Sequence, residues 1–77
     1  MIKKLSEFAI GEKGVVKALD NADSKIKRRL LDMGITPGAP IYLRKKAPLG
    51  DPIEVTIRGY ELSLRKTEAD AVVMEVK

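Results

Sequence analysis

The sequence predicts a small, mostly β domain: a five-stranded barrel with a helix between its first and second strands. Two observations predict it. Short segments alternate between apolar and polar residues, which is the period of a strand with one buried face, and glycines and prolines separate these segments at close intervals. The 77 residues are expected to form one domain, residues 1–77. Closure into a barrel would also leave few exposed strand edges.

One segment has the spacing of a helix instead. Ile26, Leu30 and Met33 recur at i, i+4 and i+7, which places them on one helix face. Residue types that cap helix N-termini precede this segment, and Gly34 follows it as a C-terminal glycine does. The pattern therefore predicts a helix over residues 22–33 that ends in a Schellman motif.

Five segments have strand patterns. Ile41 and Leu43 point to one side while their polar neighbours point to the other, and Val55 and Ile57 repeat the same alternation. The predicted strands are residues 14–19, 41–46, 53–58, 61–65 and 72–76.

Turn-forming residues connect these segments. Proline and glycine at the centre of residues 36–39 predict a type II turn, and glycine first in residues 59–60 predicts a two-residue type II′ hairpin. Two prolines and a glycine make residues 47–52 a loop. A single helical turn is expected near residues 5–8, and a polar connection with one 3₁₀ turn near residues 66–71.

The residue types present do not point to catalysis. The chain has no cysteine and no histidine, which removes disulfides, thiolate sites and the commonest general base and metal ligand. The pairs Asp20/Asp23 and Glu68/Asp70 are explained by helix-cap and loop roles, so no metal site, cofactor or small-molecule substrate is predicted. The missing cysteines and the absence of an apolar leader favour the cytoplasm.

Positive charge is the remaining feature, with 15 basic and 11 acidic residues giving a net charge of +4. Basic residues gather in residues 25–29 and 44–46. These clusters are either solvated faces of a helix and a strand or a patch that steers the domain to an acidic partner. Nucleic-acid binding by this basic helix and strand patch stays open as an alternative. It is disfavoured because the chain has only Phe8, Tyr42 and Tyr60 as stacking aromatics.

A longer motif covers most of the chain. Arg29-Leu30-Leu31-Asp32-Met33-Gly34-Ile35-Thr36-Pro37-Gly38 is followed by Pro48-Leu49-Gly50-Asp51-Pro52 and by Ile57-Arg58-Gly59-Tyr60-Glu61-Leu62-Ser63-Leu64-Arg65. This order resembles the FeoA family of ferrous-iron transport proteins.

The resemblance implies an SH3-like barrel in the cytoplasm that acts without catalysis on the membrane transporter FeoB, through the cytosolic part of FeoB, and so at the inner face of the membrane. FeoA-like domains also occur fused to metal-dependent repressors, but this chain has no room for a helix-turn-helix. Whether the domain also self-associates weakly stays open. Candidate partner contacts, chosen as exposed apolar, aromatic or basic positions, are Arg28, Leu31, Tyr42, Leu49 and Tyr60.

Overall fold

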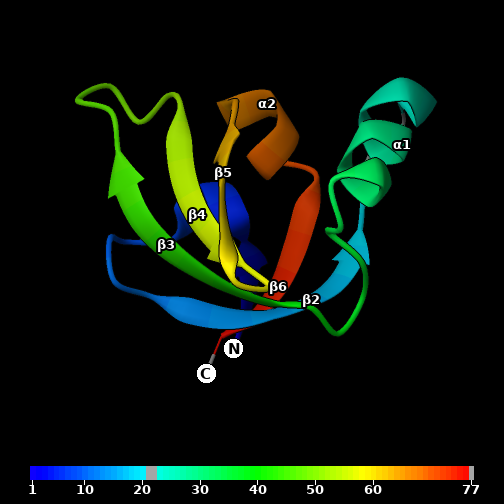
Figure 1. Ribbon diagram of the computed structural model, residues 1–77, viewed down its shortest axis with the longest axis horizontal. Helices are drawn as coiled ribbons and strands as arrows, with labels where there is room; N and C mark the ends of the chain where they lie inside the picture. Colours follow the sequence, from blue (N-terminus) through cyan, green and yellow to red (C-terminus); the bar gives the residue numbers. More distant parts are fainter. Residues whose placement is uncertain (21–22, 77) are drawn as a thin grey trace.

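The computed structural model describes residues 1–20 and 23–76, which form one curled antiparallel sheet with two helices and a 3₁₀ turn (Figure 1). Neighbouring strands follow the order β1-β6-β2-β3-β4-β5. None of the helices in the described residues is long and apolar enough to cross a membrane. In chain order the elements are β1 Ile2–Lys4, η1 Leu5–Glu7, β2 Lys13–Leu19, α1 Ser24–Asp32, β3 Pro40–Lys46, β4 Ile53–Ile57, β5 Tyr60–Leu64, α2 Lys66–Ala69 and β6 Val72–Val76.

The predicted mostly β fold with one main helix is confirmed, and that helix lies between the first two predicted strands, β2 and β3. The sheet has six strands, one more than predicted, because β1 pairs with β6. β1 has only three residues, two of them lysines, so no alternation marks it in the sequence. Within the described residues the outer strands β1 and β5 do not pair with each other, so the curl is open.

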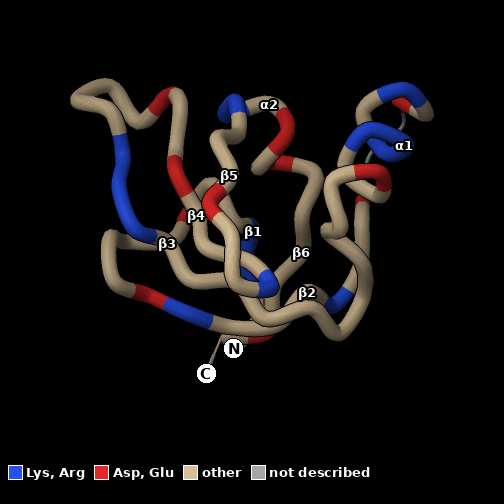
Figure 2. Tube along the Cα trace, viewed as in Figure 1, with Lys and Arg blue, Asp and Glu red and all other residues tan. Residues whose placement is uncertain are grey.

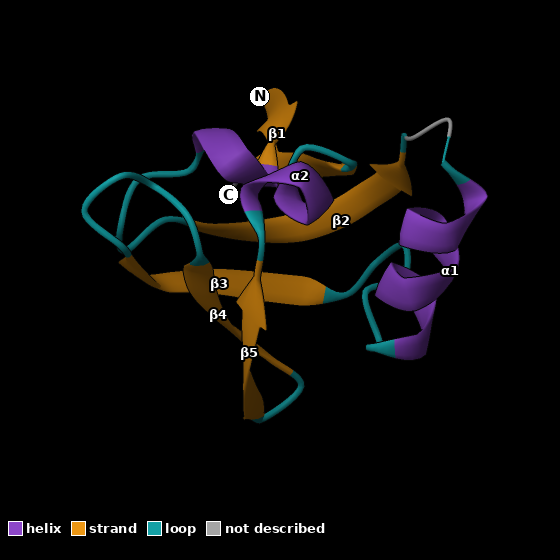
Figure 3. Ribbon diagram, turned by 90° about the horizontal axis from the view of Figure 1, so that it is seen from above, coloured by secondary structure: helices purple, strands orange, loops and turns teal. Residues whose placement is uncertain are grey.

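The core fills the inner side of the curl. Ile41 lies opposite Ile57, and Leu43 lies opposite Val55, and all four side chains are buried. In Figure 1, α2 lies across the upper opening of the sheet, and Figure 3 shows α1 standing to one side of it. The sheet thus has a buried inner face and an outer face that the helices leave uncovered.

Helix α1 begins later than expected. The predicted start at residue 22 lies outside the described residues, and the helix begins at Ser24. Asp23 is its N-cap, and its carboxylate accepts a hydrogen bond of 2.8 Å from the backbone N–H of Lys25. The cap role expected of this aspartate is confirmed.

The end of α1 has the predicted Schellman geometry. Gly34 has a φ of +88°, and its N–H donates to the Leu31 carbonyl at 3.0 Å. The N–H of Ile35 donates to the Leu30 carbonyl at 3.0 Å, and both of these apolar side chains are fully buried. This junction fastens the otherwise exposed helix to the core.

One predicted turn is confirmed and another is wrong. Residues 36–39 form the expected type II turn, with a φ of +89° at Gly38. The β4–β5 hairpin, however, pairs Ile57 with Tyr60, so its two loop residues are Arg58 and Gly59. Their φ values of 50° and 84° make it a type I′ turn, whose twist matches the strands, instead of type II′.

Gly14 is required by close packing of two strands. A Cβ atom here would collide with the backbone carbonyl of Glu75 on β6, which runs beside β2 at this point. The glycine therefore lets the two backbones approach, and it leaves this stretch of β2 without a side chain.

Leu30→Ala is expected to lower the free energy of unfolding by about 2–5 kcal/mol, because it leaves a cavity under α1. Chemical denaturation measures this change. Leu31→Ala is the matched control, because this side chain is 41% exposed and should cost under about 0.5 kcal/mol. Equal effects of the two substitutions would show that the helix face is misassigned.

Arg58→Asn is expected to stabilise the fold by about 1 kcal/mol, because asparagine adopts a positive φ more readily than arginine does. Thermal melting measures the gain. Arg58→Ala removes the guanidinium without relieving the backbone, so it should give no stabilisation. A loss of stability in the asparagine variant would contradict the strain at this turn.

Candidate partner-binding surface

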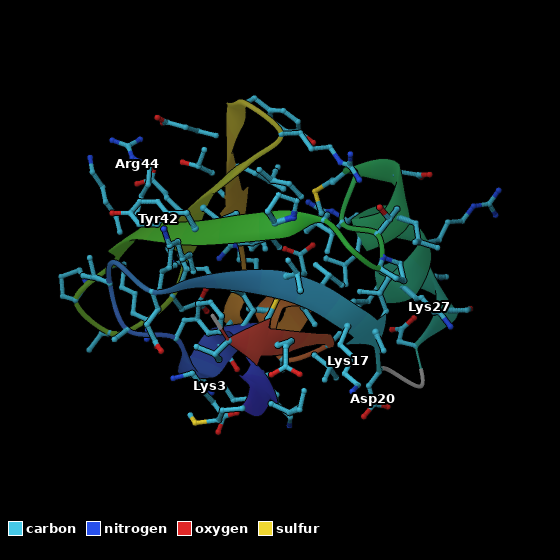
Figure 4. All side chains as sticks on the ribbon, turned by 90° about the horizontal axis from the view of Figure 1, so that it is seen from below. Lys3, Lys17, Asp20, Lys27, Tyr42 and Arg44 are labelled. Carbon is cyan, nitrogen blue, oxygen red and sulfur yellow. The ribbon has the colours of Figure 1, made fainter. Side chains whose placement is uncertain are left out.

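The outer face of β2, β3 and β4 carries an open groove of about 440 Å³. Lys13, Tyr42 and Thr56 lie opposite one another on these neighbouring strands, so their side chains share the outer face. Figure 4 shows Tyr42 on this face, with the β2 and β3 ribbons in front. The residues that line the groove are Lys13, Gly14, Pro40, Ile41, Tyr42, Thr56 and Arg58.

Tyr42 is the one residue of the groove that the sequence singled out as a partner contact. Its side chain is 43% exposed, as expected for the polar side of β3. The other side chains of the groove rim, Lys13, Thr56 and Arg58, were missed. Arginine at a turn position that favours asparagine was the available signal, but the wrong turn assignment hid it.

One ion pair and one hydrogen bond set the charge around the groove. The guanidinium of Arg58 donates to the Thr36 hydroxyl at 3.0 Å. Glu61 continues the outer row beyond Thr56, and it forms an ion pair with Arg44. No carboxylate lies among the lining residues, so the groove presents two cations beside an aromatic ring.

Tyr60 has a structural contact. It begins β5 on the same face as Ile57, at the margin of the core, and its hydroxyl donates to the Met33 carbonyl at the end of α1. Its side chain remains 44% exposed, so its role in partner binding stays a prediction.

The other predicted contacts lie elsewhere. Arg28 and Leu31 are exposed on α1, and Leu49 is 93% exposed in the loop between β3 and β4. Figure 1 places α1 and this loop at opposite sides of the molecule. The five predicted residues therefore do not form a single surface.

The two basic clusters are also separate. Figure 2 shows the basic end of β3 on one side of the molecule and α1 on the other. On α1, the Arg29 Nε atom lies 3.1 Å from a carboxylate oxygen of Glu68, whose side chain is only 7% exposed. The same glutamate accepts a hydrogen bond of 2.9 Å from the backbone N–H of Arg65. Because Glu68 belongs to α2, its ion pair with Arg29 helps to fasten α1 to α2. The two clusters therefore do not form the single basic patch that the nucleic-acid alternative would need.

Glu12, which precedes the groove residue Lys13, binds two groups from the N-terminal part of the chain. Its carboxylate accepts hydrogen bonds of 2.7 Å from the Lys3 ammonium and from the Ala9 N–H. The bond from Lys3 is the main cause that lowers the pKa of Glu12 below its ordinary value of 4.5, and the Ala9 N–H adds to it. The ammonium also lies 5.4 Å from the centre of the Phe8 ring. This carboxylate is therefore engaged within the fold.

No metal centre is evident in the part of the chain that the structure describes, where no three Asp or Glu side chains gather. The carboxylates noted in the sequence have other partners. Glu68 caps α2, and Asp70 accepts a hydrogen bond from Ser6.

The curled antiparallel sheet, with a short helix across one opening, defines a small SH3-like domain. Comparison with known proteins gives the family directly, because the FeoA domain model matches residues 3–76. The chain belongs to the FeoA family.

Three relatives illustrate the similarity. A Porphyromonas gingivalis Fe(2+) transport protein A/Fe(2+) transporter FeoB fusion protein is 32% identical over 95% of this chain, which spans only 8% of the length of that fusion. A FeoA-like protein of Clostridium acetobutylicum is 45% identical, with a TM-score of 0.89 over 97% of this chain and 86% of its own. The zinc complex of Stenotrophomonas maltophilia FeoA is 29% identical, with a TM-score of 0.83 over 95% and 89% of the two chains. That protein is described as a prokaryotic SH3 domain protein and a proposed ferrous iron transport activating factor.

The stability contributed by Glu12 is expected to depend on pH. Its lowered pKa means that the contribution is complete above pH 4.5 and is lost as the pH falls through the lower, folded-state pKa. The difference in unfolding free energy between the wild type and Glu12→Gln should shrink over that range. Denaturation at a series of pH values measures it, and a difference that stays constant would contradict the assignment.

Proposed function

We propose that this chain is a non-catalytic accessory protein of ferrous iron transport that docks on the cytosolic part of a FeoB-type transporter. The observation that carries the proposal is the fusion relative, in which a region similar to 95% of this chain shares one polypeptide with FeoB. Fusion raises the effective concentration of two domains that work together. A separate chain of the same family would have to reach its transporter through a binding surface of its own.

Leu49 is well placed for such a contact. Its loop is held by bonds from the Gly50 N–H to the Ala47 carbonyl, at 2.7 Å, and from the Ala47 N–H to the Pro52 carbonyl, at 3.0 Å. Asp51 ties the loop to α2 by accepting a bond of 3.1 Å from a backbone N–H. An apolar side chain that is 93% exposed on a fixed loop loses little conformational entropy on binding, which favours affinity.

The chemistry of the outer groove also suits binding. Its side chains supply two cations, a phenol and a hydroxyl beside apolar surface, and the sequence offers no histidine or cysteine to act as a base or nucleophile. We therefore assign the chain a role in binding or activating the transporter, and any catalytic step to the transporter itself.

The test is calorimetric titration of the chain with the cytosolic domain of the FeoB-type transporter from the same cell. Leu49→Ala is expected to weaken binding about tenfold, as loss of an interface anchor does, without changing the melting temperature. Ile10→Ala is the matched control, because that side chain is 62% exposed on another loop. Absence of binding by the wild-type chain would overturn the proposed function.

A further inference from the structure

The outer groove has the charge and shape of a site for one kind of ligand. Lys13 and Arg58 are exposed cations on its two sides, and the side chains of Pro40 and Tyr42 supply apolar surface between them. Its volume of about 440 Å³ lies within the range of ligand pockets, about 300–1,000 Å³. The groove can therefore hold an apolar side chain with anionic groups on either side.

The neighbouring carboxylates do not cancel this charge. Glu12 precedes Lys13 in sequence, but its carboxylate is bonded to Lys3. Glu61 lies in the same outer row, and it is paired with Arg44. These two acids are engaged with other cations, and no carboxylate lines the groove itself, so the two rim cations are available to an incoming anion.

Arg58 occupies its position at a cost in stability. Its φ of 50° is the left-handed region that an arginine adopts only with strain, in a turn type that asparagine or glycine would satisfy. The hydrogen bond from its guanidinium to Thr36, 3.0 Å long, holds the charge beside the groove. Backbone strain of this kind is concentrated at functional positions of proteins, and here it places a cation at the rim of the groove.

The backbone of the groove floor limits the mode of recognition. At this point β3 is paired with β2 through Tyr42 and Lys13, and with β4 through Tyr42 and Thr56. Both edges of β3 are thus paired with neighbouring strands, and a ligand cannot add here as a further strand. Recognition has to come from side chains.

We propose that this groove binds an acidic, extended peptide segment that places an apolar side chain against Tyr42 and carboxylates against Lys13 and Arg58. A protein segment is favoured over nucleic acid, because the groove offers two cations on mainly apolar surface, whereas a phosphate backbone is bound by a row of cations. The inference rests on the proposed function in one respect, since the segment is assigned to the transporter partner.

The first experiment titrates the full chain, followed by NMR, with a short synthetic peptide in which glutamate and leucine alternate. Amide shifts are expected to centre on the groove residues. Lys13→Glu and Arg58→Asn should each raise the dissociation constant about tenfold. Because Arg58→Asn is also expected to raise the melting temperature, weaker binding by this variant cannot be caused by unfolding.

Lys27→Glu is the matched control. It makes the same change in charge on α1, and Figure 4 shows Lys27 and Tyr42 at opposite ends of the molecule. Three outcomes would overturn the proposal that the groove binds an acidic peptide. They are equal weakening of peptide binding by Lys27→Glu, equal affinity for a lysine–leucine peptide, and tighter binding of a single-stranded RNA oligonucleotide.

The second experiment repeats the transporter titration with the Lys13→Glu chain. If the wild type binds the transporter domain and Lys13→Glu binds equally well, the groove is not the contact, and the proposed function stands. If the acidic peptide occupies the groove but the transporter domain does not bind, the proposed function fails, and the peptide specificity stands.

Discussion

One requirement governs the whole domain: every strand has to turn its apolar side chains to the inner side of the same curl. Ile41 and Leu43 on β3 lie opposite Ile57 and Val55 on β4, and each buried side chain of this size contributes about 1.5–3 kcal/mol. A slip of one residue would send these side chains to solvent, so the core sets the register. The same register decides which side chains form the outer face.

The outer groove is a consequence of that register. Lys13, Tyr42 and Thr56 are brought side by side only because their neighbours face the core. Gly14 has no side chain because β6 passes too close to β2 to allow one, and its backbone is part of the groove lining. The packing of the core on the inside and the shape of the groove on the outside therefore depend on the same few strand positions. In a domain this small there is little surface that the core does not influence.

Local signals determined most of the fold. The spacing of Ile26, Leu30 and Met33 and the following Gly34 were enough to predict α1 and its end, because helix periodicity and a positive-φ glycine are properties of neighbouring residues. β1 could not be predicted in this way, since three residues carry no period and its stability comes from pairing with β6, far away in the chain. The β4–β5 turn was misassigned because its register depends on strand pairing, which placed Arg58 in the loop.

For function, the sequence by itself determined the family resemblance, the lack of histidine and cysteine, and Tyr42 and Leu49 as exposed candidates. The tertiary structure alone decided which candidates lie together: it placed Arg28 and Leu31 apart from Leu49, gave Tyr60 a contact with α1, and brought Tyr42 beside Lys13 and Arg58. The physical reason is that residue type and periodicity report which side of an element is exposed. A binding surface, in contrast, is made by long-range strand pairing between segments that no local pattern connects.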